Sequence, residues 1–263
     1  MTTTSKAPER AAPPRVEVVR TFFDQPENYL ERKRFDIRIR AETTKTFLEG
    51  ANYAKMIDIG CGDGSVSLPF VSPDRYLTLL DISSTMLTLA RSRVPSDLSG
   101  NVEIKQDDFL GAVLENGSYD VVICMGVLAH VVSPSDVIQK VAALLKPGGI
   151  LILECTDSQH FVRRFYGLFT SLVAFFRPGE YRPNRLASDE VLKMAKTHGF
   201  ALKGKFRYSW PPPGSQRILS QDTIYRLIRR MFGDARRDRN QWLGFENVFC
   251  LSRTDLGSKG VPR

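Results

Sequence analysis

The sequence has few of the residues from which metal centres, disulfide frameworks and covalent nucleophiles are built. Its 263 residues include four cysteines, at positions 61, 124, 155 and 250, and three histidines. The cysteines are far apart in apolar runs and no Cys-x-x-Cys pair occurs, so we expect small buried thiols in a reducing cytosol. No zinc-ligand cluster and no nucleophilic triad is visible. We therefore expect no metal site.

Long hydrophobic runs are also absent. The broadest apolar stripe, Phe161 to Phe176, is free of charge only from Phe165 onward. This charge-free segment is well below the roughly 20 residues that are needed to cross a bilayer. The first 15 residues lack an apolar core, which predicts a disordered tail at 1–15 and not a signal peptide. A second tail is expected at 256–263, and the protein is expected in the cytoplasm.

The chain is basic, because it has 37 Lys and Arg residues but 29 Asp and Glu residues, which gives a formal net charge of +8. The basic residues are interleaved with acidic ones, so nucleic acid is not an expected partner. The length suits one α/β domain with a cap. We expect an N-terminal helical lid at 16–50 and a main domain at 51–255, with cap insertions at about 158–187 and 210–240.

The most informative stretch, MIDIGCGDGSV, runs from Met56 to Val66. An apolar run breaks at three alternate glycines and then resumes, which predicts a strand, a tight loop and a helix at Val66 to Val71. The dinucleotide fingerprint would need glycine where Ser65 stands. Asp58 would repel a pyrophosphate, whereas its carboxylate can accept hydrogen bonds from an ammonium group. The loop predicts a cradle for an adenosine-containing molecule.

Two further predicted strands end in acids. Tyr76 to Asp81 ends about 20 residues after the first glycine, where a carboxylate grips a ribose diol. The alternative for Asp81 is the N-cap of a helix at Ser84 to Arg93. Asn101 to Phe109 ends in Asp107 and Asp108, one of which is expected to bind an adenine amino group.

The middle of the chain predicts a parallel sheet. Val121 to Gly126 is a continuous apolar run, typical of a strand buried on both faces. A helix ends at Leu145, and a Pro-Gly-Gly turn leads into a strand at Ile150 to Cys155. This βαβ alternation predicts parallel, right-handed connections. Further on we expect a strand at Phe200 to Tyr208 and a last one at Gly244 to Leu251.

These motifs resemble class I S-adenosylmethionine-dependent methyltransferases. Asp-x-Gly-x-Gly-x-Gly at 58–64 resembles the family's first motif, and DISSTML at 81–87 resembles its Asp-x-Ser-x-x-Met-Leu segment. Tyr-Asp-Val-Val at 119–122 and Leu-Lys-Pro-Gly-Gly at 145–149 look like the ubiquinone and menaquinone biosynthesis branch. The resemblance covers roughly residues 55 to 154.

The resemblance implies a Rossmann-like, mostly parallel sheet of seven strands in the order 3-2-1-4-5-7-6. The last strand is antiparallel, helices cover both faces, and an N-terminal and an inserted helical segment form a cap. It implies S-adenosyl-L-methionine as the cofactor. The expected cofactor-binding residues are Asp58, Gly60, Cys61, Gly62, Gly64, Asp81, Ile82, Met86, Asp107, Asp108, Phe109 and Met125.

Methyl transfer mainly requires alignment of nucleophile, methyl group and sulfur, and a base is needed only if the nucleophile arrives protonated. His130, just beyond the fourth strand, and His160, after the fifth, are the candidate bases. The alternative for His130 is a residue that only shapes the pocket. Tyr29 is a candidate lid contact, or it packs the N-terminal helices.

We expect methyl transfer to an oxygen or nitrogen of a small, largely apolar biosynthetic acceptor, such as a natural product or a quinone-like molecule. No Asn-Pro-Pro-Tyr sequence follows the fourth strand, which favours a small acceptor over a nucleic acid base. One alternative is a lipid or membrane-surface acceptor, docked through residues 161–176. The other is an RNA-modifying or RNA-binding protein. The protein is expected to be a monomer or a homodimer.

Overall fold

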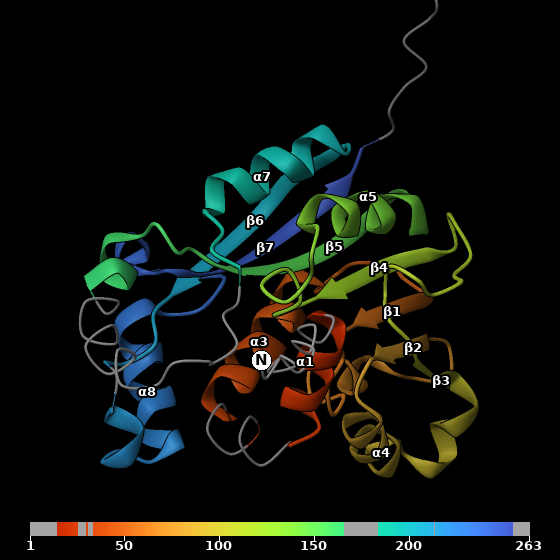
Figure 1. Cartoon of the computed structure of the whole chain (residues 1–263), viewed down its shortest axis with the longest axis horizontal. Helices are drawn as coiled ribbons and strands as arrows, with labels where there is room; N and C mark the ends of the chain where they lie inside the picture. The colour runs from red at the N-terminus through yellow and green to blue at the C-terminus, as the bar shows by residue number, and fades with distance from the viewer. Residues whose placement is uncertain (1–14, 26–29, 31–33, 166–183, 213, 255–263) are drawn as a thin grey trace, which may run out of the picture.

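The computed structural model describes residues 15–25, 30, 34–165, 184–212 and 214–254. One sheet contains the strands β1 (Lys55–Ile59), β2 (Tyr76–Asp81), β3 (Val102–Gln106), β4 (Tyr119–Cys124), β5 (Leu145–Thr156), β6 (Phe200–Tyr208) and β7 (Glu246–Arg253). Their order is β3-β2-β1-β4-β5-β7-β6, and only β7 runs antiparallel to its neighbours (Figure 1). The predicted sheet order and the antiparallel last strand are confirmed.

Helices cover both faces of the sheet. The α-helices are α1 (Arg15–Phe23), α3 (Arg34–Phe47), α4 (Ser84–Arg93), α5 (Pro134–Leu144), α7 (Ser188–Thr197) and α8 (Gln221–Phe232), and the 3-10 turns are η1 (Leu68–Phe70), η2 (Ser96–Asn101), η3 (Ser215–Arg217) and η4 (Gln241–Leu243). In Figure 1, α5 and α7 lie above the sheet, whereas α3, α4 and α8 lie below it.

Alternate strand residues supply two separate cores. In β1, Ile57 and Ile59 pack with α5 and α7, whereas Met56 packs on the opposite face with α3, α4 and α8. In β4, Val122 belongs to the same core as Ile57, and Val121 to the same core as Met56. Successive side chains of a strand point to opposite faces, so a strand buried on both faces must be apolar throughout. The predicted burial of all four cysteines is confirmed.

The predicted helix at 66–71 is wrong. The glycine loop is followed by turns and by the three-residue η1, and Val71 is already extended. Pro69 has no N–H for a hydrogen bond four residues back, and Pro73 disfavours helical backbone at the residue before it. Among the described residues, the segment directly after the loop therefore offers it no α-helix N-terminus.

The N-terminal boundary also needs correction at one residue. Arg15, which the sequence places at the end of a disordered tail, belongs to α1, and its guanidinium donates to the carbonyls of Ala129 (3.2 Å) and His130 (3.0 Å). α3 belongs to the core through Phe35 and Ile39.

Several predicted features lie wholly or partly outside the described residues. Tyr29 and the predicted tail at 256–263 lie wholly outside them, and of the predicted tail at 1–15 only Arg15 is described. Of the apolar stripe only residues 161–165 are described, and these are helical. Within the described part of the chain, no helix has the length and apolar character needed to span a bilayer.

Candidate functional site

The glycine loop lies at the carboxyl end of β1 and requires its glycines. Gly60, Gly62 and Gly64 have φ angles of +66°, +54° and +74°. A Cβ on Gly60 would come 2.6 Å from Cγ2 of Val127, and a Cβ on Gly64 would come 2.7 Å from Cδ1 of Leu68. Both the backbone conformation and the close packing therefore disfavour larger side chains at positions 60 and 64.

Asp81 joins the end of β2 to the glycine loop. Its Oδ2 accepts a hydrogen bond from the Gly62 amide (2.8 Å), and its Oδ1 accepts one from the Ser83 amide (2.9 Å). Burial raises the pKa of this carboxyl, against the effect of the amides. The helix N-cap is Ser83, whose side chain accepts from the Met86 amide (3.2 Å). The alternative of Asp81 as N-cap is wrong.

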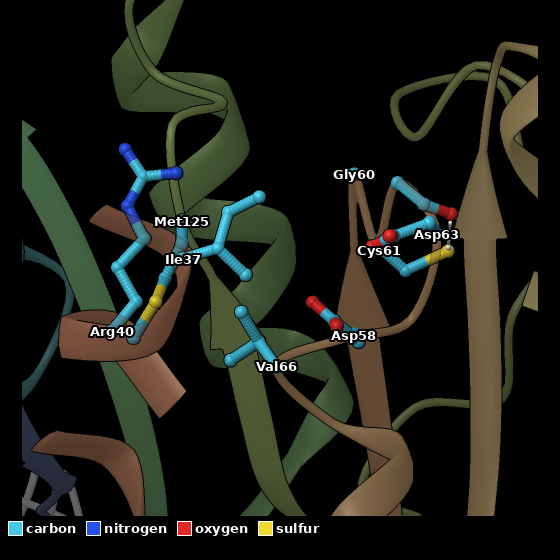
Figure 2. A pocket seen from close by; sticks show the side chains of 9 residues that line it. Ile37, Arg40, Asp58, Gly60, Cys61, Asp63, Val66 and Met125 are labelled. Carbon is cyan, nitrogen blue, oxygen red and sulfur yellow. Dashed lines mark hydrogen bonds between the residues drawn. The ribbon is translucent and has the colours of Figure 1, made fainter. Parts of the chain in front are cut away.

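A small pocket opens beside the loop (Figure 2). Five predicted cofactor residues line it, namely Asp58, Gly60, Cys61, Gly62 and Met125, together with Ile37, Arg40, Asp63 and Val66. The walls thus come from β1, from the residue after β4, and from α3. In Figure 2, Arg40 and Asp58 stand on different sides of this space.

Asp58 is a buried acid with unused hydrogen-bonding capacity. Its side chain is 3% exposed, and its Oδ2 has no hydrogen-bond partner of standard geometry among the described residues. Burial raises its pKa from 3.8 to about 7, and the charges of Asp81 and Asp63 add to this shift. The Ser67 hydroxyl partly opposes it. Such a carboxyl suits a ligand that brings a cationic donor.

Arg40 faces the pocket from α3 and is held by two carboxylates. Its Nε and Nη2 lie 2.9 and 2.8 Å from Oε1 of Glu154 in β5, and Nη2 lies 3.1 Å from Oδ2 of Asp36. Sequence reasoning missed these three residues. The sequence did contain a signal for a buried ion pair. Asp36 and Arg40 are four residues apart and share a helix face with the apolar Phe35 and Ile39.

α1 lies across the carboxyl edge of the sheet. Arg15 contacts the loop after β4, and at the other end the Ser83 hydroxyl donates to Oδ1 of Asp24 (2.6 Å). Asp24 also acts electrostatically on Asp81 and helps to raise its pKa. The helix therefore covers the side of the site where the ends of β2 and β4 meet the glycine loop.

The other predicted cofactor residues lie at the ends of β2 and β3 and, for Met86, in α4, and they do not line the pocket. Asp107 is exposed and donates its amide to the Asp81 carbonyl (3.1 Å), while Asp108 is half-buried. Phe109 is buried and its carbonyl accepts from Lys140 (2.7 Å). Met86 is buried in the core, and the Ile82 carbonyl accepts from Gln106 (3.4 Å).

Neither candidate base lines the pocket. His130 follows β4 and its ring meets the edge of Phe23 at 5.3 Å. Burial lowers its pKa to about 4, and the charges of Arg15 and Arg40 contribute, so the imidazole is neutral at pH 7. His160 lies beyond β5, with Nε2 2.9 Å from the Trp242 carbonyl. Of the two, His130 is the one beside α1 and the end of β4.

Known proteins are similar to this chain in sequence and in fold. Residues 57–153 match the family described as a methyltransferase domain. A ubiquinone biosynthesis O-methyltransferase of Xanthomonas euvesicatoria is 34% identical over 116 residues, which covers 44% of this chain and 48% of that protein. The chain thus spans about half the length of this relative. One of Burkholderia orbicola is 30% identical over 177 residues, which covers 64% of this chain and 74% of that protein.

A solved structure agrees over most of the chain. Magnesium protoporphyrin IX methyltransferase from Synechocystis, with bound S-adenosylhomocysteine, superimposes with a TM-score of 0.62 at 18% identity. The match covers 92% of this chain and 100% of that one. At this identity the likeness establishes the fold alone.

Proposed function

This chain belongs to the class I S-adenosylmethionine-dependent methyltransferases, and from that premise we propose that it methylates an oxygen or nitrogen of a small, largely apolar acceptor. The relatives named ubiquinone biosynthesis O-methyltransferases favour an oxygen and a quinone-like molecule. S-adenosylmethionine supplies a methyl group activated by its sulfonium. The residues described above have to bind the cofactor and align the acceptor.

The observation that carries this proposal is the pairing of Asp58 and Arg40 in one pocket. The amino acid end of S-adenosylmethionine has an ammonium and a carboxylate. Asp58, buried and with an Oδ2 that lacks a partner among the described residues, suits the ammonium. Arg40 suits the carboxylate, because this cationic side chain lines the same pocket and its planar guanidinium matches the geometry of a carboxylate.

The nucleoside end is assigned to the ends of β2 and β3. Asp81 is the ribose ligand that we propose, since each carboxylate oxygen has a second lone pair beyond the one used by a backbone amide. Asp108 is the better of the two adenine candidates, because it is half-buried whereas Asp107 is exposed. Ile82 would pack against the adenine between them.

His130 is the base that we propose for a hydroxyl acceptor. Its neutral imidazole can accept the acceptor's proton, although a pKa of about 4 makes it a weak base. Part of that low pKa comes from the charge of Arg40. A ligand carboxylate bound to Arg40 would offset this charge, so cofactor binding should raise the pKa of His130 toward the useful range.

Calorimetric titration tests the cofactor assignment. We expect S-adenosylmethionine and S-adenosylhomocysteine to bind the wild type and not Asp81→Ala, and we expect no binding of NADH. Binding of NADH alone would refute the proposal. Quinone precursors with free hydroxyls would then be screened for methyl transfer, and turnover of amines but of no hydroxyl compound would move the methylated atom to nitrogen.

An acceptor at a membrane surface is the second candidate, favoured by a group of exposed aromatic side chains. Phe161 and Trp242 stack at 6.0 Å and are 55% and 65% exposed, and Phe165 is 58% exposed. Arg163 and Arg164 flank them in sequence, as at an interface with anionic lipid. Sedimentation with anionic vesicles, lost in Trp242→Ser, would support this candidate, whereas a wild type that stays in the supernatant at low salt would exclude it.

A further inference from the structure

Lys140 reaches from α5 to the loop that follows β3, residues 107–112. Its ammonium donates to three backbone carbonyls of this loop, those of Phe109 (2.7 Å), Leu110 (3.1 Å) and Ala112 (2.6 Å). A lysine ammonium has three N–H donors, which matches the three carbonyls. The backbone of the loop is therefore gathered around one side chain that lies 28 to 31 residues away along the chain.

The loop is also held by its own backbone and by two apolar side chains. The carbonyl of Asp108 accepts hydrogen bonds from the amides of Gly111 (3.0 Å) and Ala112 (2.8 Å), which closes a turn. Phe109 and Ala112 are buried in the core that includes residues of α5. Without the ammonium, three gathered carbonyls would lose this donor, two of them on buried residues, so the loop would have to rearrange.

This loop borders the part of the site that is assigned to the nucleoside. The Asp107 amide donates to the carbonyl of Asp81 (3.1 Å), whose carboxylate accepts the amide of Gly62 in the glycine loop (2.8 Å). Burial lowers the pKa of Lys140, and the charges of Asp108 and Asp107 oppose this shift. Both acids are thus close enough to the ammonium to act on it. A rearrangement of the loop would move Asp108 relative to Asp81.

We propose that Lys140 determines the selectivity of this site for adenine, as a positioning residue that acts through Asp108. The inference rests on the proposed function, in which Asp108 accepts a hydrogen bond from the adenine amino group. A carboxylate selects adenine only if it is held within hydrogen-bond distance of that amino group, also when a different base is offered. Lys140 meets this condition, because its three hydrogen bonds fix the backbone directly after Asp108.

Two forms of the demethylated cofactor test this selectivity. S-adenosylhomocysteine carries an amino group on its base, and S-inosylhomocysteine carries a carbonyl oxygen at the same position. A fixed carboxylate accepts a hydrogen bond from the amino group but has no donor to meet in the carbonyl oxygen. The wild type should therefore prefer the adenosyl form by about a hundredfold. The sugar and the amino acid end are the same in both molecules, so the ratio of the two dissociation constants reports on the base.

The experiment measures both dissociation constants by calorimetry for the wild type, Lys140→Met and Lys140→Gln. In both variants the preference should fall to about tenfold or less, because the loop no longer fixes Asp108. Lys140→Gln is the milder change, since its amide keeps N–H donors, and it provides the test if Lys140→Met does not fold.

The matched control is Lys146→Met, which also removes a lysine contact. The Lys146 ammonium donates to Oδ1 of Asp120 (2.6 Å), whose Oδ2 accepts the Lys55 amide (2.9 Å) at the amino end of β1. The glycine loop follows the carboxyl end of the same strand, so this contact lies at the other edge of the sheet. Lys146→Met should lower the stability of the protein and leave the preference for the adenosyl form unchanged.

A double-mutant cycle tests the route through Asp108. Asp108→Ala should lower the preference by about tenfold. Adding Lys140→Met to this variant should lower it no further, because the acid through which Lys140 acts is gone. A purely structural role of Lys140 predicts a different result, since a less stable protein binds both molecules more weakly and the ratio stays the same.

The outcomes distinguish failure of the inference from failure of the proposed function. A wild type that binds neither molecule contradicts the proposed function. A wild type that binds both equally, or whose preference is kept in a folded variant at position 140, overturns the inference and leaves the cofactor assignment intact. An effect of Lys140→Met that is as large without Asp108 as with it also overturns the inference. If neither variant at position 140 folds, Lys140 is needed for the fold itself and the selective role is refuted.

Discussion

Proton release on cofactor binding is the most direct test of the pocket. Asp58 has a pKa of about 7 in the ligand-free protein because it is buried beside other acids. A ligand ammonium would hold it ionised, so the protonated fraction must lose its proton for binding to occur. The affinity for S-adenosylmethionine should therefore fall as the pH is lowered through 7.

The size of the effect follows from this pKa. The apparent dissociation constant scales as one plus the ratio of protonated to ionised Asp58, which is about 11 at pH 6 and about 1.1 at pH 8 for a pKa of about 7. Binding should weaken by about tenfold between these pH values, or about 1.4 kcal/mol. At pH 7 about half a proton should be released per cofactor bound.

Calorimetry in buffers of different ionisation enthalpy measures both quantities. Asp58→Asn is the control, because it keeps the shape of the side chain and removes the titration. It should bind more weakly at pH 8, through loss of a charged hydrogen bond worth about 1.5–3 kcal/mol, and its affinity should depend little on pH between 6 and 8. Any pH dependence left in this variant would belong to Asp81, whose pKa is also raised.

The ligand-free protein provides an independent check through its stability. Because folding raises the pKa of Asp58 from 3.8 to about 7, the protonated form stabilises the fold. This contribution is complete below pH 3.8 and is lost as the pH rises to 7, by about 4 kcal/mol at 1.36 kcal/mol per pH unit.

A wild type whose affinity for the cofactor stays within twofold from pH 6 to 8, with no proton released, would refute the assignment of Asp58.

Three further predictions concern single side chains. His130→Gln should lower kcat about a hundredfold if His130 is the base, because the neutral imidazole that would take the acceptor's proton is lost. A fall of less than about threefold at every pH would remove the role. Arg40→Lys keeps the charge and loses the planar fork, so calorimetry should show cofactor binding weakened about tenfold. Gly60→Ala should lower the free energy of unfolding, measured with urea, by more than Gly117→Ala does. Both glycines have φ above +60°, but only a Cβ at position 60 would meet Val127, at 2.6 Å. Equal losses of stability would contradict the close packing.

Local sequence patterns predict the structure correctly where neighbours in sequence are also neighbours in space. β2 and β6 occupy the predicted residues, and the glycine loop has the positive φ angles that only glycine adopts easily. The helix predicted at 66–71 does not form, because Pro69 and Pro73 oppose the helical backbone that the apolar spacing suggests. The N-cap of α4 went to Ser83 because the chain turns after Asp81, whose oxygens accept amides on both sides.

The sequence by itself determined the family, the sheet order and five of the nine residues that line the pocket, because these depend on short motifs and on the alternation of apolar residues. The tertiary structure alone decided what faces Asp58. Arg40 comes from α3 and Glu154 from β5, 114 residues apart, and Arg40 lines the pocket, held by Glu154, only once the helix packs on the sheet. Burial likewise sets the pKa values of Asp58 and His130, and burial is a property of the folded chain.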